Sequence, residues 1–249
     1  TPHRGMDRYK LGWKGKNKEG KMNRVKINYL LIIYLALVMG LSGCATTGIY
    51  SIEINYDPTY AHVPDFLQPA HKDLQSIIHV VEFTDARKLD DPLVIGRVIE
   101  SSGAKVLVLP RHTRPTMAVA EGVRQYLRNA GYNVSSVGPK WDLQEKTMQQ
   151  AVTGKLLIGG VIEEMEINCR KSFPTNTYTT KLKMTLYLAD SVNKKIVNQV
   201  AVQATTSLDH IMFSEGRLGD QAALAIGDAI EKVFEKEELV RAMRQILQR

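Results

Sequence analysis

The strongest constraint on the fold lies near residue 185, where apolar and polar side chains alternate strictly. Such alternation predicts a β-strand, because successive side chains of a strand point to opposite faces. The polar segment "ADSVNKK" then leads into 195–206, which again has strand composition. The sequence therefore predicts a long antiparallel hairpin with one buried and one solvated face. The predicted buried positions are Leu182, Met184, Leu186 and Leu188, and the solvated ones are Lys181, Lys183, Thr185 and Tyr187.

Strand composition recurs through the chain before this hairpin. Gly96 and Gly103 are expected at turns or at close approaches of the backbone. The pair Gly159-Gly160 lies inside a longer apolar run, which predicts either a β-bulge or a close approach there. The predicted strands cover 76–87, 93–103, 105–110, 132–137 and 155–167.

Helical signals lie between these strands and at the C-terminus. Pro115 suits the first turn of a helix, and Gly131 suits its end. Ser214 can cap a second helical segment. The expected fold class is α/β (α+β): a mixed or antiparallel sheet with a long C-terminal hairpin, covered by two or three helices. The predicted helices cover 114–129, a short piece at 141–152 capped by Asp142, and 214–249 with a charged break at 235–238.

An apolar run near the N-terminus, inside "KINYLLIIYLALVMGLSGCATTG", is short for a membrane span. The uncharged run 29–43 has 15 residues, whereas a helix needs about 20 to cross the hydrocarbon core. Arg24 and Lys26 precede it, and small residues follow it. This layout is typical of a secretory signal peptide. Translation from Met22 would give a signal of ordinary length, so 1–21 is expected to be upstream sequence or an extended basic region.

The end of this run, Leu41-Ser42-Gly43-Cys44, resembles the lipobox of bacterial lipoproteins. The resemblance implies that Cys44 is acylated and becomes the first residue after cleavage. The alternative is a buried N-terminal helix that happens to end in a cysteine. The expected organisation is 1–43 as extension and signal peptide, 44–75 as lipidated N-terminus and tether, and 76–249 as a single α/β domain.

The distribution of charge argues against a nucleic-acid partner. The whole chain has a net charge of +7. Residues 1–43 carry nine basic and two acidic side chains, so they account for the entire excess and 44–249 is neutral. A basic surface is the usual electrostatic signature of nucleic-acid binding. The predicted partners are therefore a membrane, through the lipid anchor, and an envelope protein or lipid, with the oligomeric state left open.

Several core patterns together resemble the YajG-like family of bacterial outer-membrane lipoproteins. They are "HVVEFTDAR", Ile95-Gly96, Pro115 followed by "VAEGVRQYLRNAGYNV", "LLIGGVIEEMEI" and "TTKLKMTLYLADSVNKKIV". The family is similar in turn to auxiliary lipoproteins of envelope transport systems. The resemblance spans 77–234 and implies a compact domain with helices packed on a mixed or antiparallel sheet. It carries over no catalytic residues.

One loop has the composition and position of a candidate binding site. Arg111, His112 and Arg114 lie just before the predicted helix, whose free amide groups favour an anion such as phosphate or carboxylate. An exposed basic loop without a ligand is the alternative. We expect Cys169 to be a buried, unpaired thiol.

No other cluster has the spacing of a catalytic, metal or cofactor site. The histidines are scattered, and His79 on a strand is expected to be structural. Strand alternation would place Glu163 on one face and Glu164 with Glu166 on the other, which would split a carboxylate pair. The sequence therefore predicts no enzyme, no cofactor and no metal.

The function expected from the sequence is that of a non-catalytic binding or scaffold module in the periplasm. The protein would be lipid-anchored at the inner face of the outer membrane, or at the cell membrane of an organism with a single membrane. The alternatives are an auxiliary subunit of a lipid-transport system, a regulator of cell-wall synthesis, or a hydrolase acting on envelope polymers.

Overall fold

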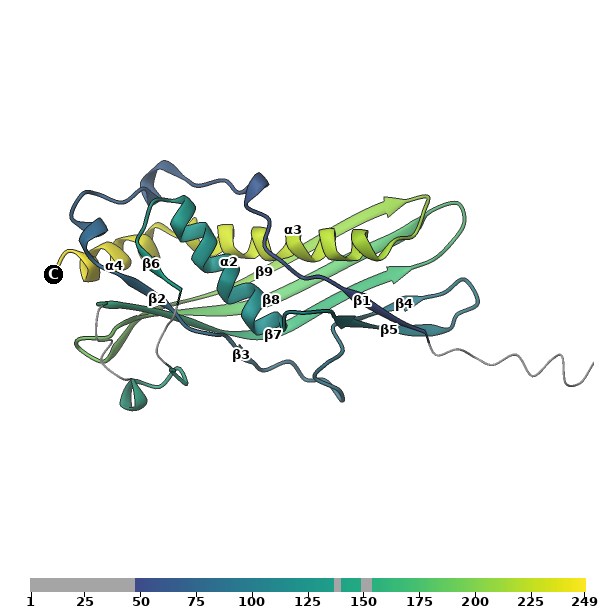
Figure 1. The fold of residues 1–249 in the computed structure, drawn as a ribbon, viewed down its shortest axis with the longest axis horizontal. Helices are drawn as coiled ribbons and strands as arrows, with labels where there is room; N and C mark the ends of the chain where they lie inside the picture. The colour runs from purple at the N-terminus through teal and green to yellow at the C-terminus, as the bar shows by residue number, and fades with distance from the viewer. Residues whose placement is uncertain (1–47, 137–139, 149–153) are drawn as a thin grey trace, which may run out of the picture. The chain divides into compact units, whose positions relative to one another are not determined.

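Strand β7 (Leu156–Arg170) is the centre of one mixed nine-stranded sheet. The computed structural model describes residues 48–136, 140–148 and 154–249. Antiparallel β8 pairs with β7 along its whole length, while β2, β3 and β4 run parallel to β7 in succession along its other edge. Figure 1 shows the helices on one face of this sheet. The other strands are β1 (Ile49–Ile52), β2 (Ile78–Val80), β3 (Thr84–Asp85), β4 (Gly96–Ile99), β5 (Lys105–Pro110), β6 (Val134–Ser135), β8 (Asn176–Asp190) and β9 (Lys195–His210).

The hairpin predicted from the alternating segment is confirmed. Strands β8 and β9 pair antiparallel from Asn176↔His210 to Asp190↔Lys195. The four apolar positions predicted to face the core are fully buried, at 0% exposure each. The opposite face is less solvated than predicted, because Thr185 is only 9% exposed and its hydroxyl donates to Glu163. A second, small apolar cluster includes the end of β8 and is formed by Val81, Trp141, Met148, Leu157 and Ala189.

Three helices and the sheet enclose the main core, which confirms the predicted fold class. Pro115 begins α2, and Gly131 follows its end with a φ of +101°, a conformation that favours glycine. Ser214 caps α3 by accepting from the backbone amide of Arg217 at 3.2 Å. The helices are α2 (Pro115–Asn129), α3 (Glu215–Phe234) and α4 (Glu237–Leu247).

Segment 48–75, predicted as a tether, is packed into the fold instead. β1 pairs with β5 in parallel, and Ile52, Ile54 and Leu67 are at most 2% exposed. The compact unit therefore begins at Gly48, which corrects the predicted domain start at residue 76. Three short 3₁₀ helices lie in this segment, at Pro58–Tyr60, Asp65–Leu67 and Asp73–Gln75.

One further local prediction needs correction, and one that left two alternatives open is decided between them. The helix expected over 141–152 is only a 3₁₀ turn at Glu145–Thr147, and its N-cap is Gln144 rather than Asp142. Residues 149–152 of that prediction lie outside the described residues. The pair Gly159-Gly160 is a close approach and not a bulge: a Cβ at Gly160 would lie 2.2 Å from the Phe83 ring. The bulge in β7 lies instead between Ile162 and Glu164.

Candidate functional site

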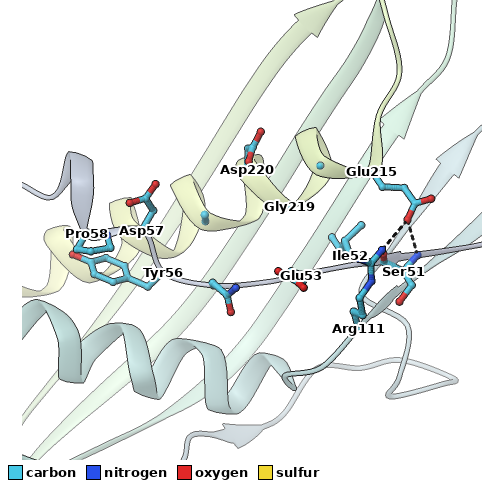
Figure 2. Close-up of a pocket in the computed structure, with 13 residues that line it drawn as sticks. Ser51, Ile52, Glu53, Tyr56, Asp57, Pro58, Arg111, Glu215, Gly219 and Asp220 are labelled. Atoms are coloured by element: carbon cyan, nitrogen blue, oxygen red, sulfur yellow. Dashed lines mark hydrogen bonds and ion pairs between the residues drawn. The ribbon is translucent and has the colours of Figure 1, made fainter.

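A groove runs between helix α3 and the chain segment that follows β1. Figure 2 shows the extended chain from Ser51 to Tyr56 lying beside α3. The chain can approach closely because α3 has glycine at 219, where a Cβ would lie 2.8 Å from the backbone oxygen of Glu53. A larger residue there would push the two walls of the groove apart.

The groove consists of two adjoining cavities that share Asp57, Asp220 and Ala223. Their volumes are about 440 and 570 Å³. Small residues at helical spacing form the α3 wall, so few large side chains fill this face of the helix. These residues are Gly216, Gly219, Ala223 and Gly227.

Acidic side chains are the majority of the charged groups in the lining. At one end, Arg111 pairs with Glu215 at 3.5 Å. At the other end, Asp228 pairs with Lys232 at 2.7 Å. Among the described residues, no cation lies within ion-pair distance of Asp57 or Asp220. Cation-free carboxylates beside a helix face with few large side chains suit a positively charged, extended ligand. The acidic lining residues are Glu53, Asp57, Glu215, Asp220, Asp228 and Glu231.

Tyr56 holds the wall of the groove in place. Its Cβ lies beside Gly122 of α2, and its ring lies beside Gly227 of α3. The side chain is 7% exposed, and its hydroxyl has no hydrogen-bond partner among the described residues. Burial, with the negative charge of Glu231 as a second cause, raises its pKa to about 12. Tyr56 therefore stays neutral and packs both helices against the segment.

The predicted anion-binding loop lies at the N-terminus of α2, as expected, but the side chains of Arg111, His112 and Arg114 each lie beside a carboxylate. Arg111 Nη2 is 3.5 Å from Glu215 Oε2. His112 Nε2 is 3.8 Å from an oxygen of Glu53, and Arg114 Nη2 is 3.0 Å from an oxygen of Glu82. An incoming anion would have to displace these partners. Anion binding by Arg111, His112 and Arg114 stays a prediction.

The bulge in β7 changes the expected arrangement of the glutamates. Glu163 pairs with Lys183 and Glu164 with Lys181, both at 2.7 Å. The two lysines are two residues apart on β8 and share a face, so Glu163 and Glu164 share it as well. The predicted split by alternation is therefore wrong, because the extra residue of the bulge reverses the phase of the strand. Both carboxylates are neutralised by lysines.

The remaining candidates have structural surroundings. Cys169 is a free, buried thiol, as predicted, and burial raises its pKa to about 11. His79 is 6% exposed in β2. Within 48–136, 140–148 and 154–249, no group of three or more histidine, cysteine and carboxylate side chains could hold a metal ion.

The predicted lipidation site, Cys44, and the lipobox residues Leu41, Ser42 and Gly43 lie outside the described residues. In the part of the chain that the structure describes, no helix has the length and apolar character required to cross a membrane.

The groove was not predicted from the sequence. The prediction of a tether over 44–75 removed Glu53 and Asp57 from consideration, and the α3 residues were expected only to cover the sheet. The available signal was the spacing of Gly216, Gly219 and Ala223, which leaves one stripe of the amphipathic helix without large side chains.

Comparison with known proteins yields distant structural likenesses. No protein-family model matches the chain, and no curated protein matches it significantly. A Xanthomonas campestris protein described under the family model DUF330 has a TM-score of 0.40 and 11% identity, and the match covers 81% of this chain and 100% of that one. A candidate lipoprotein from Caulobacter crescentus CB15 has a TM-score of 0.34 and 10% identity, covering 59% and 89% of the two chains.

Lipoprotein GNA1162 from Neisseria meningitidis is a third similar structure, with a TM-score of 0.31 and 13% identity over 61% of this chain and 95% of that one. Solved structures similar to this chain thus include bacterial lipoproteins. The assignment to the YajG-like family stays a prediction.

Proposed function

We propose that this protein is a lipid-anchored lipoprotein of the bacterial envelope and that its folded domain is a non-catalytic binding module. The groove beside α3 is its binding surface. The observation that carries this proposal is the pair of carboxylates, Asp57 and Asp220, that face the groove without a cation partner among the described residues. The occupant is an extended, positively charged segment of another envelope component.

Binding accounts for this geometry better than hydrolysis does. The acidic side chains are spread along the groove rather than converging on one point. His62 and His112 both contact acidic residues of the groove lining, and the His112 side chain is 72% exposed. Among the described residues, no serine, threonine or cysteine side chain forms a hydrogen bond with it. A hydrolase that uses a serine, threonine or cysteine nucleophile requires that nucleophile to be hydrogen-bonded to its base.

Site-specific photocrosslinking in intact cells tests the groove. A photoreactive amino acid replaces Leu224, which lines the groove and is 44% exposed. The matched control position is Leu74, which is 43% exposed and lies outside the groove lining. We expect an adduct from position 224 that is absent from position 74 and that is lost when Asp220→Lys reverses the charge.

Adducts of equal yield at both positions, or adducts unaffected by Asp220→Lys, would contradict binding at the groove. The chemical identity of the captured component then distinguishes the finer assignments. A component of a lipid-transport system would make the protein an auxiliary subunit. A cell-wall synthase would make it a regulator.

The anchor has a separate test. Replacement of Cys44 by serine removes the sulfur that would carry the acyl group, so we expect a larger, unacylated precursor. Acyl chains contribute about 0.8 kcal/mol per buried methylene, so two or three chains hold a neutral domain on a bilayer without a basic patch. Mass spectrometry of the membrane-extracted protein provides the readout. A wild-type protein that still contains 22–43 and carries no acyl group would refute the anchor.

A further inference from the structure

Three loops and the start of β1 meet at one end of the sheet, at the right in Figure 1. The pairs Ile99↔Arg170 and Asn176↔His210 place the ends of β4, β7 and β9 at this end. We call this end the tip. It comprises the loops 100–104, 171–175 and 211–214 together with Ile49.

The tip exposes large apolar side chains. Phe173 is 99% exposed, Ile211 75%, Met212 66% and Ile49 58%. Single exposed apolar residues are ordinary on protein surfaces, but several at one end of a fold indicate a contact with a partner or a membrane. The amide of Asn176 donates to the backbone oxygen of Ile211 at 2.9 Å, which connects the loop of Phe173 to that of Ile211 and Met212.

The charges of the tip are neutralised within the protein. The loops contain one basic residue, Lys171, and one acidic residue, Glu100. Lys171 Nζ lies 2.8 Å from Glu100 Oε1, 2.8 Å from the Tyr50 hydroxyl and 3.9 Å from the centre of the Phe213 ring. This cluster joins β1 to all three loops and pairs their two charges, while the exposed Lys105 and Arg170 flank the loops.

The chain length between the predicted anchor and the tip is short. Four peptide units separate Cys44 from Gly48, and Gly48 immediately precedes Ile49. An extended chain spans at most about 3.6 Å per residue, so about 14 Å is the maximum reach. If Cys44 is anchored in the bilayer, the tip, where β1 begins directly after Gly48, must therefore lie near the bilayer surface.

We propose that the tip inserts Phe173, Ile211 and Met212 into the lipid surface, so that the lipid anchor and the tip together fix the orientation of the domain. This inference rests on the proposed lipid anchor. The occupant is the bilayer, because the exposed side chains are apolar, the tip has no net charge and the anchor leads to the same end. The groove along α3 then remains available to a periplasmic ligand.

Depth-dependent fluorescence quenching tests the inference with the mature protein extracted from membranes. The variant Phe173→Cys receives a nitrobenzoxadiazole label, and Val192→Cys is the matched control. Val192 is 53% exposed in the β8–β9 turn, at the opposite end of the 15-residue strand β8. The native Cys169 is buried and its pKa is raised to about 11, so it stays unlabelled at neutral pH.

The proteins are reconstituted into phosphatidylethanolamine–phosphatidylglycerol vesicles that contain a nitroxide lipid. The vesicles are then separated from unbound protein by flotation in a density gradient. We expect both variants to float, with the label at 173 blue-shifted and quenched several-fold more strongly than the label at 192.

Each other outcome has a definite meaning. If both variants float and both labels are quenched equally, the tip inference fails while the anchor stands. A blue shift at 173 without lipid quenching would show that a protein, such as a second copy of this chain, covers the tip, and this would also overturn the inference. If neither variant floats, the proposed anchor fails, and the tip inference fails with it.

Discussion

Asp190 is expected to set the geometry of the β8–β9 turn, and its removal should destabilise the whole domain. The side chain is 4% exposed. Oδ1 accepts from the backbone amides of Val192 and Asn193, both at 3.0 Å. Oδ2 accepts from the Asn193 side chain at 2.6 Å and pairs with Arg249 at 3.3 Å. The carboxylate therefore accepts the backbone hydrogen bonds of the turn that joins β8 to β9.

The magnitude follows from these contacts. Asp190→Ala leaves two partly buried amides without an acceptor, at about 1–3 kcal/mol each, so we expect a loss of about 2–6 kcal/mol in the free energy of unfolding. At about 2–4 °C per kcal/mol for a domain of this size, Tm should fall by about 4–24 °C. Asp190→Asn keeps an oxygen acceptor for the amides and should cost less, about 1–2 kcal/mol.

The effect of pH gives a second readout. Burial alone would raise the pKa of Asp190, but hydrogen bonds from Asn193 and Val192 and the charge of Arg249 hold it below its ordinary value of 3.8. A lowered folded-state pKa stabilises the fold above the ordinary pKa, and this contribution is lost as the pH falls through the lowered value. The stability difference between wild type and Asp190→Asn should therefore be full at pH 6 and shrink below pH 3.8.

Urea unfolding followed by circular dichroism measures these differences. The control is Asp209→Ala, which removes an exposed carboxylate that, among the described residues, accepts only from the Thr177 hydroxyl, at 2.7 Å. It should change stability by less than about 0.5 kcal/mol. If Asp190→Ala is as stable as Asp209→Ala, the turn does not depend on this carboxylate and the reasoning is refuted.

The remaining predictions concern the sheet, the thiol and the basic loop. Leu186→Asp should prevent folding because it buries an unpaired charge. Thr185→Asp should cost about 1–3 kcal/mol, because residue 185 is 9% exposed and lies beside the Glu163 carboxylate. Thermal melting that shows both variants at wild-type stability would contradict the burial of these two positions. Cys169 should resist iodoacetamide at pH 8 until urea unfolds the domain, and labelling of the folded protein at the rate of a free thiol would contradict its burial. If the basic loop binds phosphate, substitution of Arg111 and Arg114 by glutamine should abolish the rise in Tm with added phosphate; an unchanged rise would exclude the loop as the site.

The sequence by itself determined the elements whose signals are local. The alternation around Leu186 predicted β8 and its buried face, and Pro115 and Gly131 bracketed α2 correctly. Strand β5 and the N-cap of α3 at Ser214 were also predicted. These signals are contained within a few residues, because side-chain direction, capping and turn conformation depend on the backbone immediately around them.

Only the tertiary structure decided where these elements meet. The segment after Gly48 reads as a polar tether, yet it adds strand β1 and buries Ile52 and Ile54, because a distant partner, β5, supplies the hydrogen bonds. The phase of β7 reverses at Glu163, where a bulge accommodates one extra residue opposite β8. The groove and the tip each combine segments separated by more than 100 residues, as in the contact of Arg111 with Glu215 and of Tyr50 with Lys171. Such contacts depend on packing between distant segments: the small residues of α3 indicate an open stripe on the helix, but local patterns do not say which segment lies against it.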